Sequence, residues 1–261
     1  MQNKKFNRFI FKNKKSQISF FIIIAIIICF LILSIIIFNQ KIKPNISNNL
    51  NPNSFIESCV SESLNEALEI IKKNGGFIEI KNGVMYKDEN INFLCYTPRF
   101  YEPCLNQNPL LIEKVESEIK KYSEEKINQC FYNYKKINEK KFKIEVGDNF
   151  EINITLKPER IDVKVKKEME ISKEDEKNRY EEFNYEIISQ IYNILKVAVE
   201  IINQESNYCN FDNLGFMIFY PSYEITKIKT GESNTIYSIS EINSGETFKF
   251  AVRSCVLPAG I

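Results

Sequence analysis

Residues 142–167, FKIEVGDNFEINITLKPERIDVKVKK, decide the fold. Apolar and polar side chains alternate along three runs of this segment: FKIEV at 142–146, NFEINITLK at 149–157 and IDVKVKK at 161–167. An alternation with a period of two is typical of half-buried antiparallel strands, which turn one face to a core and the other to water. The segment therefore predicts antiparallel sheet.

Helical spacing precedes these strands. Apolar residues recur every three or four positions over 54–74 and again over about 109–134, which predicts two amphipathic helices. Ser54 and Glu57 are spaced as a capping box for the first helix. Gly75-Gly76 is expected to end it, because glycine accepts the left-handed backbone found at helix ends.

Between these helices the chain shows a hairpin signal. Asn82-Gly83 separates the short apolar runs at 77–80 and 84–86, as in a hairpin with a tight turn. INFLCYT, at 91–97, is expected to add a third strand.

After the alternating segment, helix and strand signals follow in turn. A charged stretch at 167–177 leads to helical spacing over 178–202, which predicts a third, long helix. The last fifty residues are predicted to form strands: GFMIFY, YEITKIK, TIYSIS and TFKFAVRS. The fold class is thus α+β over residues 54–261, with about three amphipathic helices and a possible subdomain seam near 136–141.

Upstream of this domain lies a long apolar run. Residues 18–38, ISFFIIIAIIICFLILSIIIF, are uncharged, and as a helix they would extend about 31 Å, close to the hydrocarbon thickness of a bilayer. Residues 1–17 are a basic stub, and residues 39–53 are rich in Asn, Pro and Ser, as a flexible tether is. The order predicts a single transmembrane helix that acts as an uncleaved signal anchor, ahead of an outer domain.

Charge around the apolar run predicts the orientation. Six Lys and Arg residues and no acid precede it, whereas only Lys41 and Lys43 follow closely, so the N-terminus is expected in the cytoplasm and the domain outside. From Asn39 onward 29 basic residues face 34 acidic ones. This mildly acidic balance gives no footprint for nucleic acid, which requires a concentrated basic surface.

Six cysteines fall in the predicted outer domain, and an even number there indicates three disulfides. Metal binding is the rival, but it normally requires close cysteine pairs or histidine, and the chain has no His. Fifteen pairings are possible for six cysteines, and sequence cannot select among them. The pairs expected here join two helices, close a Pro-bounded loop and fix a helix exit to the last strand: Cys59–Cys130, Cys95–Cys104 and Cys209–Cys255.

No catalytic, cofactor-binding or metal-ligating constellation is found. The absence of His removes Ser–His and Cys–His nucleophile pairs, and no phosphate-binding glycine loop is present. Ser123 and Lys126 spell S-x-x-K, a pattern common by chance. Tyr96, Phe100 and Tyr101 lie within the loop bounded by Cys95 and Cys104, where they could present a binding surface or pack as a local core; the second interpretation is preferred.

Two sequons are candidate glycosylation sites. Asn45 lies in the tether, and Asn153 lies in one of the alternating runs. Such sequons also occur by chance in a chain this rich in asparagine.

KKSQISFF at 14–21 resembles the processing site of archaeal class III prepilins, in which a basic residue or glycine precedes Q-x-S-x-E-F. Gln17 and Ser19 match this pattern, which implies cleavage between Ser16 and Gln17. Phe21 stands where the family has an acid that supports subunit assembly. Its presence favours an uncleaved anchor that does not polymerise.

The whole order is similar to a family of uncharacterised single-pass archaeal membrane proteins: a basic stub, the apolar run, a tether, ESCV…ALEIIKKNGGFI, a helix ending in NQC, strands, a long helix and FKFAVRSC. The resemblance implies location and architecture without an activity.

These observations predict a cell-membrane protein with a structural, adhesion or binding role in the envelope. Its expected partners are membrane lipid and an envelope protein or glycan. The alternative is a membrane-tethered extracytoplasmic enzyme or enzyme subunit. An acidic cleft with strongly perturbed carboxylates would favour the enzyme, and an exposed aromatic patch would favour binding.

Overall fold

The structure is a computed structural model that describes Ile28 and residues 51–174, 176–231 and 233–257. No helix among these residues is long and apolar enough to cross a membrane. The basic stub, the predicted span except Ile28, and most of the tether lie outside the described residues, as do the candidates Ser16, Gln17 and Asn45.

Residues 51–261 form one compact unit, and the predicted α+β class is confirmed. The described helices are α2 (Pro52–Lys73), α3 (Leu111–Asn138), α4 (Ile191–Tyr208) and α5 (Asn213–Phe219). One sheet contains β4 (Lys143–Val146), β5 (Glu151–Lys157), β6 (Arg160–Lys173) and β7 (Glu176–Ile188). The other contains β1 (Gly83–Tyr86), β2 (Glu89–Tyr96), β3 (Leu105–Asn106), β8 (Tyr223–Lys229), β9 (Thr235–Glu241) and β10 (Thr247–Arg253).

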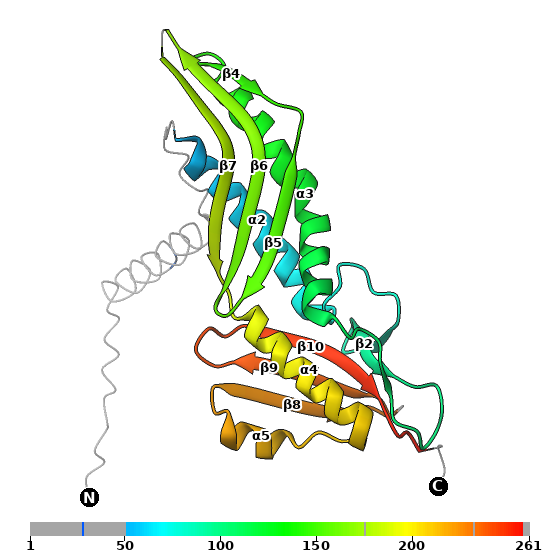
Figure 1. Cartoon of the computed structure of the whole chain (residues 1–261). Coiled ribbons are helices and arrows are strands. Elements are labelled where there is room, and N and C mark those ends of the chain that lie inside the picture. The colour runs from blue at the N-terminus through cyan, green and yellow to red at the C-terminus, as the bar shows by residue number, and fades with distance from the viewer. Residues whose placement is uncertain (1–27, 29–50, 175, 232, 258–261) are drawn as a thin grey trace, which may run out of the picture. The chain divides into compact units, whose positions relative to one another are not determined.

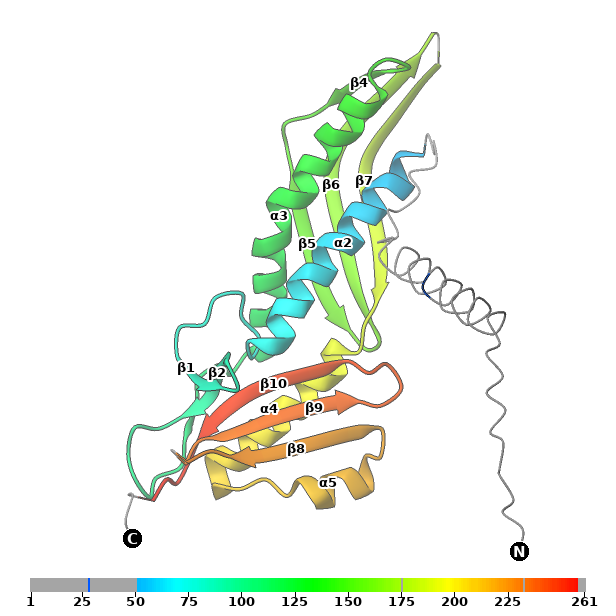
Figure 2. The same ribbon diagram turned by 180° about the vertical axis from the view of Figure 1, so that it is seen from behind.

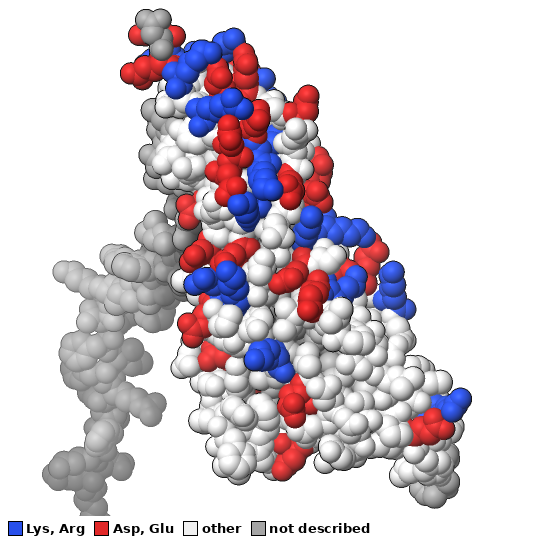
Figure 3. Space-filling model, viewed as in Figure 1, with Lys and Arg blue, Asp and Glu red and all other residues white. Residues whose placement is uncertain are grey.

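The four-stranded sheet is antiparallel, as the alternating segment predicts. Strand β6 pairs with β4 and β5 along one side and with β7 along the other. Helices α2 and α3 cover one face of this sheet (Figures 1 and 2). The opposite face is occupied by Lys, Arg, Asp and Glu side chains of both signs (Figure 3), with cross-strand ion pairs such as Lys164–Glu182 at 2.7 Å. This pattern suits a solvated sheet face.

Helix α2 begins earlier than the capping box suggested. Asn51 is the N-cap, and its Oδ1 accepts a hydrogen bond from the Asn53 N–H at 3.0 Å. Pro52 follows at a position where proline is favoured, because its missing N–H would have no partner there anyway. The predicted apolar face is confirmed as buried: Ile56, Val60, Leu64, Ala67, Leu68 and Ile71.

The first hairpin turns at a different place from the predicted one. Strands β1 and β2 pair around Lys87 and Asp88, whose φ values are 49° and 65°. Positive φ at both central residues is what a tight hairpin turn requires. Residues 77–80 form no strand, so the prediction of a turn at Asn82-Gly83 is wrong.

The third predicted helix, over 178–202, is wrong over about its first half. Residues 176–188 form β7, which pairs with β6, and α4 begins only at Ile191. The α4 N-terminus has no side-chain cap from its own N-cap residue. Instead Glu246, from the loop between β9 and β10, accepts the Gln190 N–H at 2.7 Å and the Ser189 hydroxyl at 3.0 Å.

The six-stranded sheet is mixed, because β2 runs parallel to β10, whereas only antiparallel strands were expected. Helix α4 packs against β9 and β10 (Figure 1). One hydrophobic core runs continuously from α2, α3 and the four-stranded sheet to α4 and the six-stranded sheet. The region suggested as a seam, 136–141, holds the end of α3 and the turn into β4, which packs on the same helix.

GFMIFY, predicted as a strand, belongs to helix α5 instead. Asp212 caps this helix, with Oδ1 accepting the Gly215 N–H at 3.0 Å. A local cap therefore decides the conformation of this apolar run.

Candidate functional site

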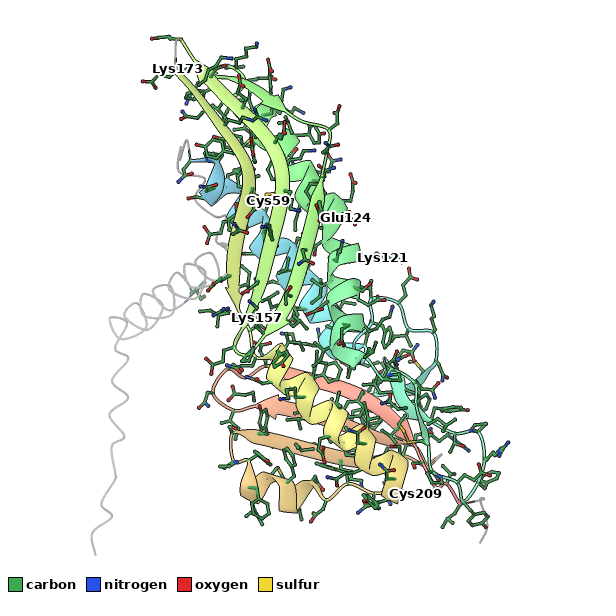
Figure 4. All side chains as sticks on the ribbon, viewed as in Figure 1. Cys59, Lys121, Glu124, Lys157, Lys173 and Cys209 are labelled. Atoms are coloured by element: carbon green, nitrogen blue, oxygen red, sulfur yellow. A yellow bond between two sulfur atoms is a disulfide. The ribbon has the colours of Figure 1, made fainter. Side chains whose placement is uncertain are left out.

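The six cysteines lie in the three pairs that the sequence analysis named. Disulfides join Cys59 to Cys130, Cys95 to Cys104 and Cys209 to Cys255, with Cα–Cα distances of 6.4, 5.3 and 5.6 Å. Figure 4 labels Cys59 on α2 and Cys209 at the end of α4. The bridges connect α2 with α3, β2 with the residue just before β3, and the end of α4 with the segment after β10.

A polar groove of about 760 Å³ lies beside the first turns of α3. Its walls are residues 77–82, which follow α2, and α3 residues 114–122; β2 and residues 107–108 contribute the rest. The lining includes four amide side chains (Asn82, Asn92, Gln107, Asn108), three lysines (Lys81, Lys114, Lys121), two acids (Glu79, Glu118) and three rings (Phe77, Phe93, Tyr122).

Glu118 fixes one wall of the groove to the other. Its Oε2 accepts the Ile78 N–H at 3.1 Å, and its Oε1 pairs with Lys114 Nζ at 2.7 Å. Desolvation acts to raise the pKa of the Glu118 carboxyl, but these two bonds outweigh it and lower the pKa. The carboxylate thus holds the irregular 77–82 segment in place in its ionised form.

Asn92 and Gly75 shape the opposite side. Asn92 is buried; its Oδ1 accepts the Asn82 N–H at 3.4 Å and its Nδ2 donates to the Phe93 carbonyl at 3.2 Å. Gly75 has φ 69°, and a Cβ there would lie 3.1 Å from the Asn92 carbonyl oxygen. The chain can leave α2 along this path because glycine stands at the turn.

Several lining groups form no ion pair or hydrogen bond within the described part of the chain, although the Lys121 charge helps to lower the pKa of the Glu118 carboxyl. Lys81 and Lys121 form no ion pair, and the Ser117 hydroxyl forms no hydrogen bond there. All three side chains are exposed, and Figure 4 shows Lys121 projecting from α3. The groove therefore combines a fixed framework with free cationic and hydrogen-bonding groups, which is an arrangement for binding a polar ligand.

Lys167 is a second unusual feature. Its side chain is 1% exposed, and Nζ donates to Asn128 Oδ1 at 3.0 Å and to the Tyr132 hydroxyl at 3.4 Å. Nζ also lies 5.0 Å from the Tyr132 ring centroid and 5.8 Å from that of Phe150. No carboxylate of the described residues lies within ion-pair distance, which is a costly setting for an ammonium.

The remaining sequence candidates are dispersed. Asn153 is exposed on β5. Ser123 is buried in α3 whereas Lys126 is exposed and pairs with Glu66, so the S-x-x-K residues do not act together. Within the described ranges no three His, Cys, Asp or Glu side chains are grouped to hold a metal ion.

The aromatic loop closed by Cys95 and Cys104 is more open than the preferred interpretation expected. Phe100 and Tyr101 are exposed, while Tyr96 is half-buried against Phe93, with ring centroids 5.0 Å apart. The Arg253 guanidinium lies 5.7 Å from the Phe100 ring centroid. Packing as a local core holds for Tyr96 but not for the two residues at the loop tip.

The groove had no signal in the sequence, because two irregular segments and a few residues of α3 and β2 form it. Comparison with known proteins returns no matching family model, no matching curated protein and no matching solved structure.

Proposed function

We propose that this chain is a membrane-anchored cell-envelope protein whose outer domain binds an acidic saccharide in the groove beside α3. The observation that carries the proposal is the groove lining, in which exposed Lys81 and Lys121 stand among amides on a framework fixed by Glu118.

The chemistry of the lining favours a sugar. Amide side chains donate and accept hydrogen bonds at once, as sugar hydroxyls do. In the groove the Asn82 and Asn108 amides can serve a sugar in this way, whereas Asn92 and Gln107 Nε2 already bond to protein groups. The rings of Phe77 and Tyr122 are half-buried in the groove, with Lys114 Nζ 5.6 Å and Lys126 Nζ 4.1 Å from their centroids. The ring surface that these ammonium groups leave uncovered can contact the C–H face of a sugar ring. Three lysines against two acids select a ligand with carboxylate or sulfate groups.

The sequence supports the location. The uncharged run at 18–38 is long enough to span a bilayer, and the basic stub before it predicts a cytoplasmic N-terminus. Three disulfides suit an oxidising compartment outside the reducing cytosol. Exposed Phe100 and Tyr101 agree with a binding role, since exposed aromatic groups mark interaction sites.

Titration calorimetry of the full chain in nanodiscs tests the ligand. An oligogalacturonate should bind, binding should weaken as salt rises, and a neutral mannose oligomer should bind much less. Lys121→Glu should weaken oligogalacturonate binding. Lys136→Glu, an equally exposed charge reversal near the far end of α3, should not. Equal binding of the two sugars, or equal loss in the two variants, would refute the proposed site.

Location is tested separately by labelling intact cells with a membrane-impermeant maleimide. After reduction the outer cysteines should react, whereas an Arg8→Cys variant should show no label at position 8. Label at position 8 without permeabilisation would place the basic stub outside and reject the orientation.

A further inference from the structure

Helix α5 carries an apolar surface that no described residue covers. Leu214, Ile218 and Phe219 are 67%, 78% and 80% exposed, and Tyr220 and Ile242 are 53% and 58% exposed. Ile242 adjoins the end of α5, because its N–H donates to the Ser222 carbonyl at 2.9 Å. These five residues are called the α5 patch.

The α5 patch is held firmly from beneath. Phe216 stacks on Tyr220 with ring centroids 4.5 Å apart and contacts Phe211, and the Met217 sulfur accepts the Ile225 N–H at 3.1 Å. The inner residues of α5 thus attach it to β8 and the core. The outer residues are fixed in water, where exposure of large apolar groups is unfavourable.

The patch also lacks charge. Residues 213–222, NLGFMIFYPS, contain no Asp, Glu, Lys or Arg. In Figure 3 the part of the domain formed by the six-stranded sheet, α4 and α5 shows few charged side chains, in contrast to the charged face of the other sheet. Leu, Ile and Phe with an adjacent Tyr are the residues that enter the interfacial zone of a bilayer.

We infer that the α5 patch inserts into the interfacial region of the membrane that anchors the chain, as a second point of attachment. This rests on the anchor of the proposed function. Twelve residues, 39–50, separate the apolar run from the described domain, so Asn51 stays within about 41 Å of the bilayer surface. A random coil of twelve residues has a root-mean-square length of about 19 Å.

A short tether raises the effective concentration of bilayer around the patch into a range where weak contacts are populated. A lone patch of five residues would bind free vesicles poorly, because single weak anchors are reversible. Joined to a transmembrane helix, the same patch needs no large affinity. The tether of the proposed anchor therefore keeps a bilayer within reach of the domain that carries α5.

The chain contains no Trp, so Phe219→Trp gives a single tryptophan probe in the full-length protein. Its emission is measured in nanodiscs with ordinary lipid and with lipid brominated along the acyl chains, which quenches only tryptophan in the bilayer. Ile188→Trp is the matched control, since Ile188 is 89% exposed but lies at the end of β7. We expect blue-shifted emission and bromolipid quenching for Phe219→Trp, and neither for Ile188→Trp.

Adding Ile218→Glu to Phe219→Trp should abolish the quenching while circular dichroism and co-elution with nanodiscs stay unchanged, because Ile218 makes little contact with the core. A blue shift without bromolipid quenching would overturn the inference. If that blue shift then depended on the number of protein copies per disc, a second chain would cover the patch. If it did not, another segment of the same chain would cover it. Quenching in both single-Trp variants would show that membrane contact is not confined to the α5 patch, and would overturn the inference. Failure to co-elute with nanodiscs would reject the anchor itself.

Discussion

The Lys227 ammonium lies 3.3 Å from the Glu205 carboxylate, with the two side chains 13% and 4% exposed. The Tyr237 hydroxyl donates to the same carboxylate, and Lys227 Nζ also donates to Asn210 Oδ1 at 2.7 Å. Burial, followed by the Glu205 charge and hydrogen bond, raises the pKa of Tyr237, so this phenol stays protonated and donates. The cluster ties α4 to β8 and β9.

Removing one partner of this pair should be costly. Glu205→Ala leaves the Lys227 ammonium buried without its counter-charge, and we expect it to lower the free energy of unfolding by about 3–5 kcal/mol. The double variant Glu205→Leu/Lys227→Met should recover only part of the loss, because two apolar side chains replace two buried charges but the buried Tyr237 hydroxyl loses its acceptor. Urea unfolding followed by circular dichroism measures both.

An exposed pair supplies the control for that prediction. Lys177 and Glu170 lie 2.9 Å apart on the charged sheet face. Lys177→Ala should cost less than about 1 kcal/mol, since water screens such pairs. Equal losses in Glu205→Ala and Lys177→Ala would mean that burial does not set the strength of the first pair.

The three disulfides should differ in what they add to stability. In the chain-entropy account a bridge stabilises more when it closes a longer loop, and the sequence separations are 71, 46 and 9 residues. We expect losses of about 4.4, 4.0 and 2.6 kcal/mol for paired Cys→Ala replacements at 59/130, 209/255 and 95/104. Thermal unfolding of the three variants gives the order, and a reversed order would contradict the chain-entropy explanation.

Glu246 should behave as a cap supplied from outside its helix. It accepts hydrogen bonds from Gln190 and Ser189 at the start of α4, and its carboxylate lies 3.8 Å from Lys72 Nζ. Glu246→Ala should cost about 1–2 kcal/mol, because it removes both the acceptor and the negative charge from a helix N-terminus. Glu246→Gln keeps an acceptor and should lose less; Glu224→Ala, on exposed β8 surface, should lose almost nothing.

Glu116 and Glu118 should give opposite pH signatures. Desolvation raises the pKa of Glu116, even though its carboxylate accepts a hydrogen bond from the Leu156 N–H at 2.7 Å. At Glu118 desolvation also acts to raise the pKa, but the bonds from Lys114 and Ile78 outweigh it, and the pKa is lowered. A raised carboxyl pKa gives stability that is lost as pH rises through the folded-state value. A lowered pKa gives stability that is lost as pH falls through it.

Relative to the natural chain, Glu116→Gln should therefore gain stability as pH rises above the ordinary glutamate value. Glu118→Gln should lose stability at neutral pH, and this loss should shrink as pH falls below the ordinary value. Urea midpoints across pH 3–7 measure both, and the two glutamines serve as controls for each other because the sites lie two residues apart on α3. The same sign in both variants would refute the assignment of causes.

Lys167 should contribute little net stability. Its ammonium is buried against Asn128, Tyr132 and Phe150, and Lys167→Met fills a similar volume without a charge to desolvate. We expect the free energy of unfolding to stay the same or to rise by about 1 kcal/mol or more. Lys166→Met, at an exposed ion pair with Glu151, is the control and should change it by less than about 1 kcal/mol. A large loss in the free energy of unfolding that is confined to Lys167→Met would show that the hydrogen bonds of the Lys167 ammonium to Asn128 and Tyr132 stabilise the fold.

Sequence patterns predicted the fold where one period dominated. The alternation over 142–167 and the apolar face of α2 each fit a single periodic structure. Residues 178–188 fit both a helix and a strand. Tyr180, Phe183 and Ile187 have helical spacing, whereas Phe183, Tyr185 and Ile187 alternate with polar residues as in a strand. Pairing with the long strand β6 decided between them, and that contact is invisible in the local sequence.

Other misses have local causes. The hairpin turn lies at Lys87-Asp88 because β1 had to meet β2 in the register that buries Ile91. Asn82 instead lines the groove, and Gly83 begins β1. For α5, the apolar run GFMIFY suggested a buried strand, whereas its outer residues are exposed. The groove could not be predicted, since Glu118 and Ile78 meet across forty residues of chain.

The parallel pairing of β2 with β10 limits the order in which the chain can fold during its synthesis. β10 lies between β2 and β9, yet about 150 residues of synthesis separate it from β2, a wait of roughly 10–30 s at ordinary ribosome speed. Cys95–Cys104 and then Cys59–Cys130 can close during that interval, whereas Cys209 must remain a thiol until Cys255 emerges. The six-stranded sheet therefore stays incomplete, and Cys209 stays without its native partner, until residues 247–255 have been synthesised.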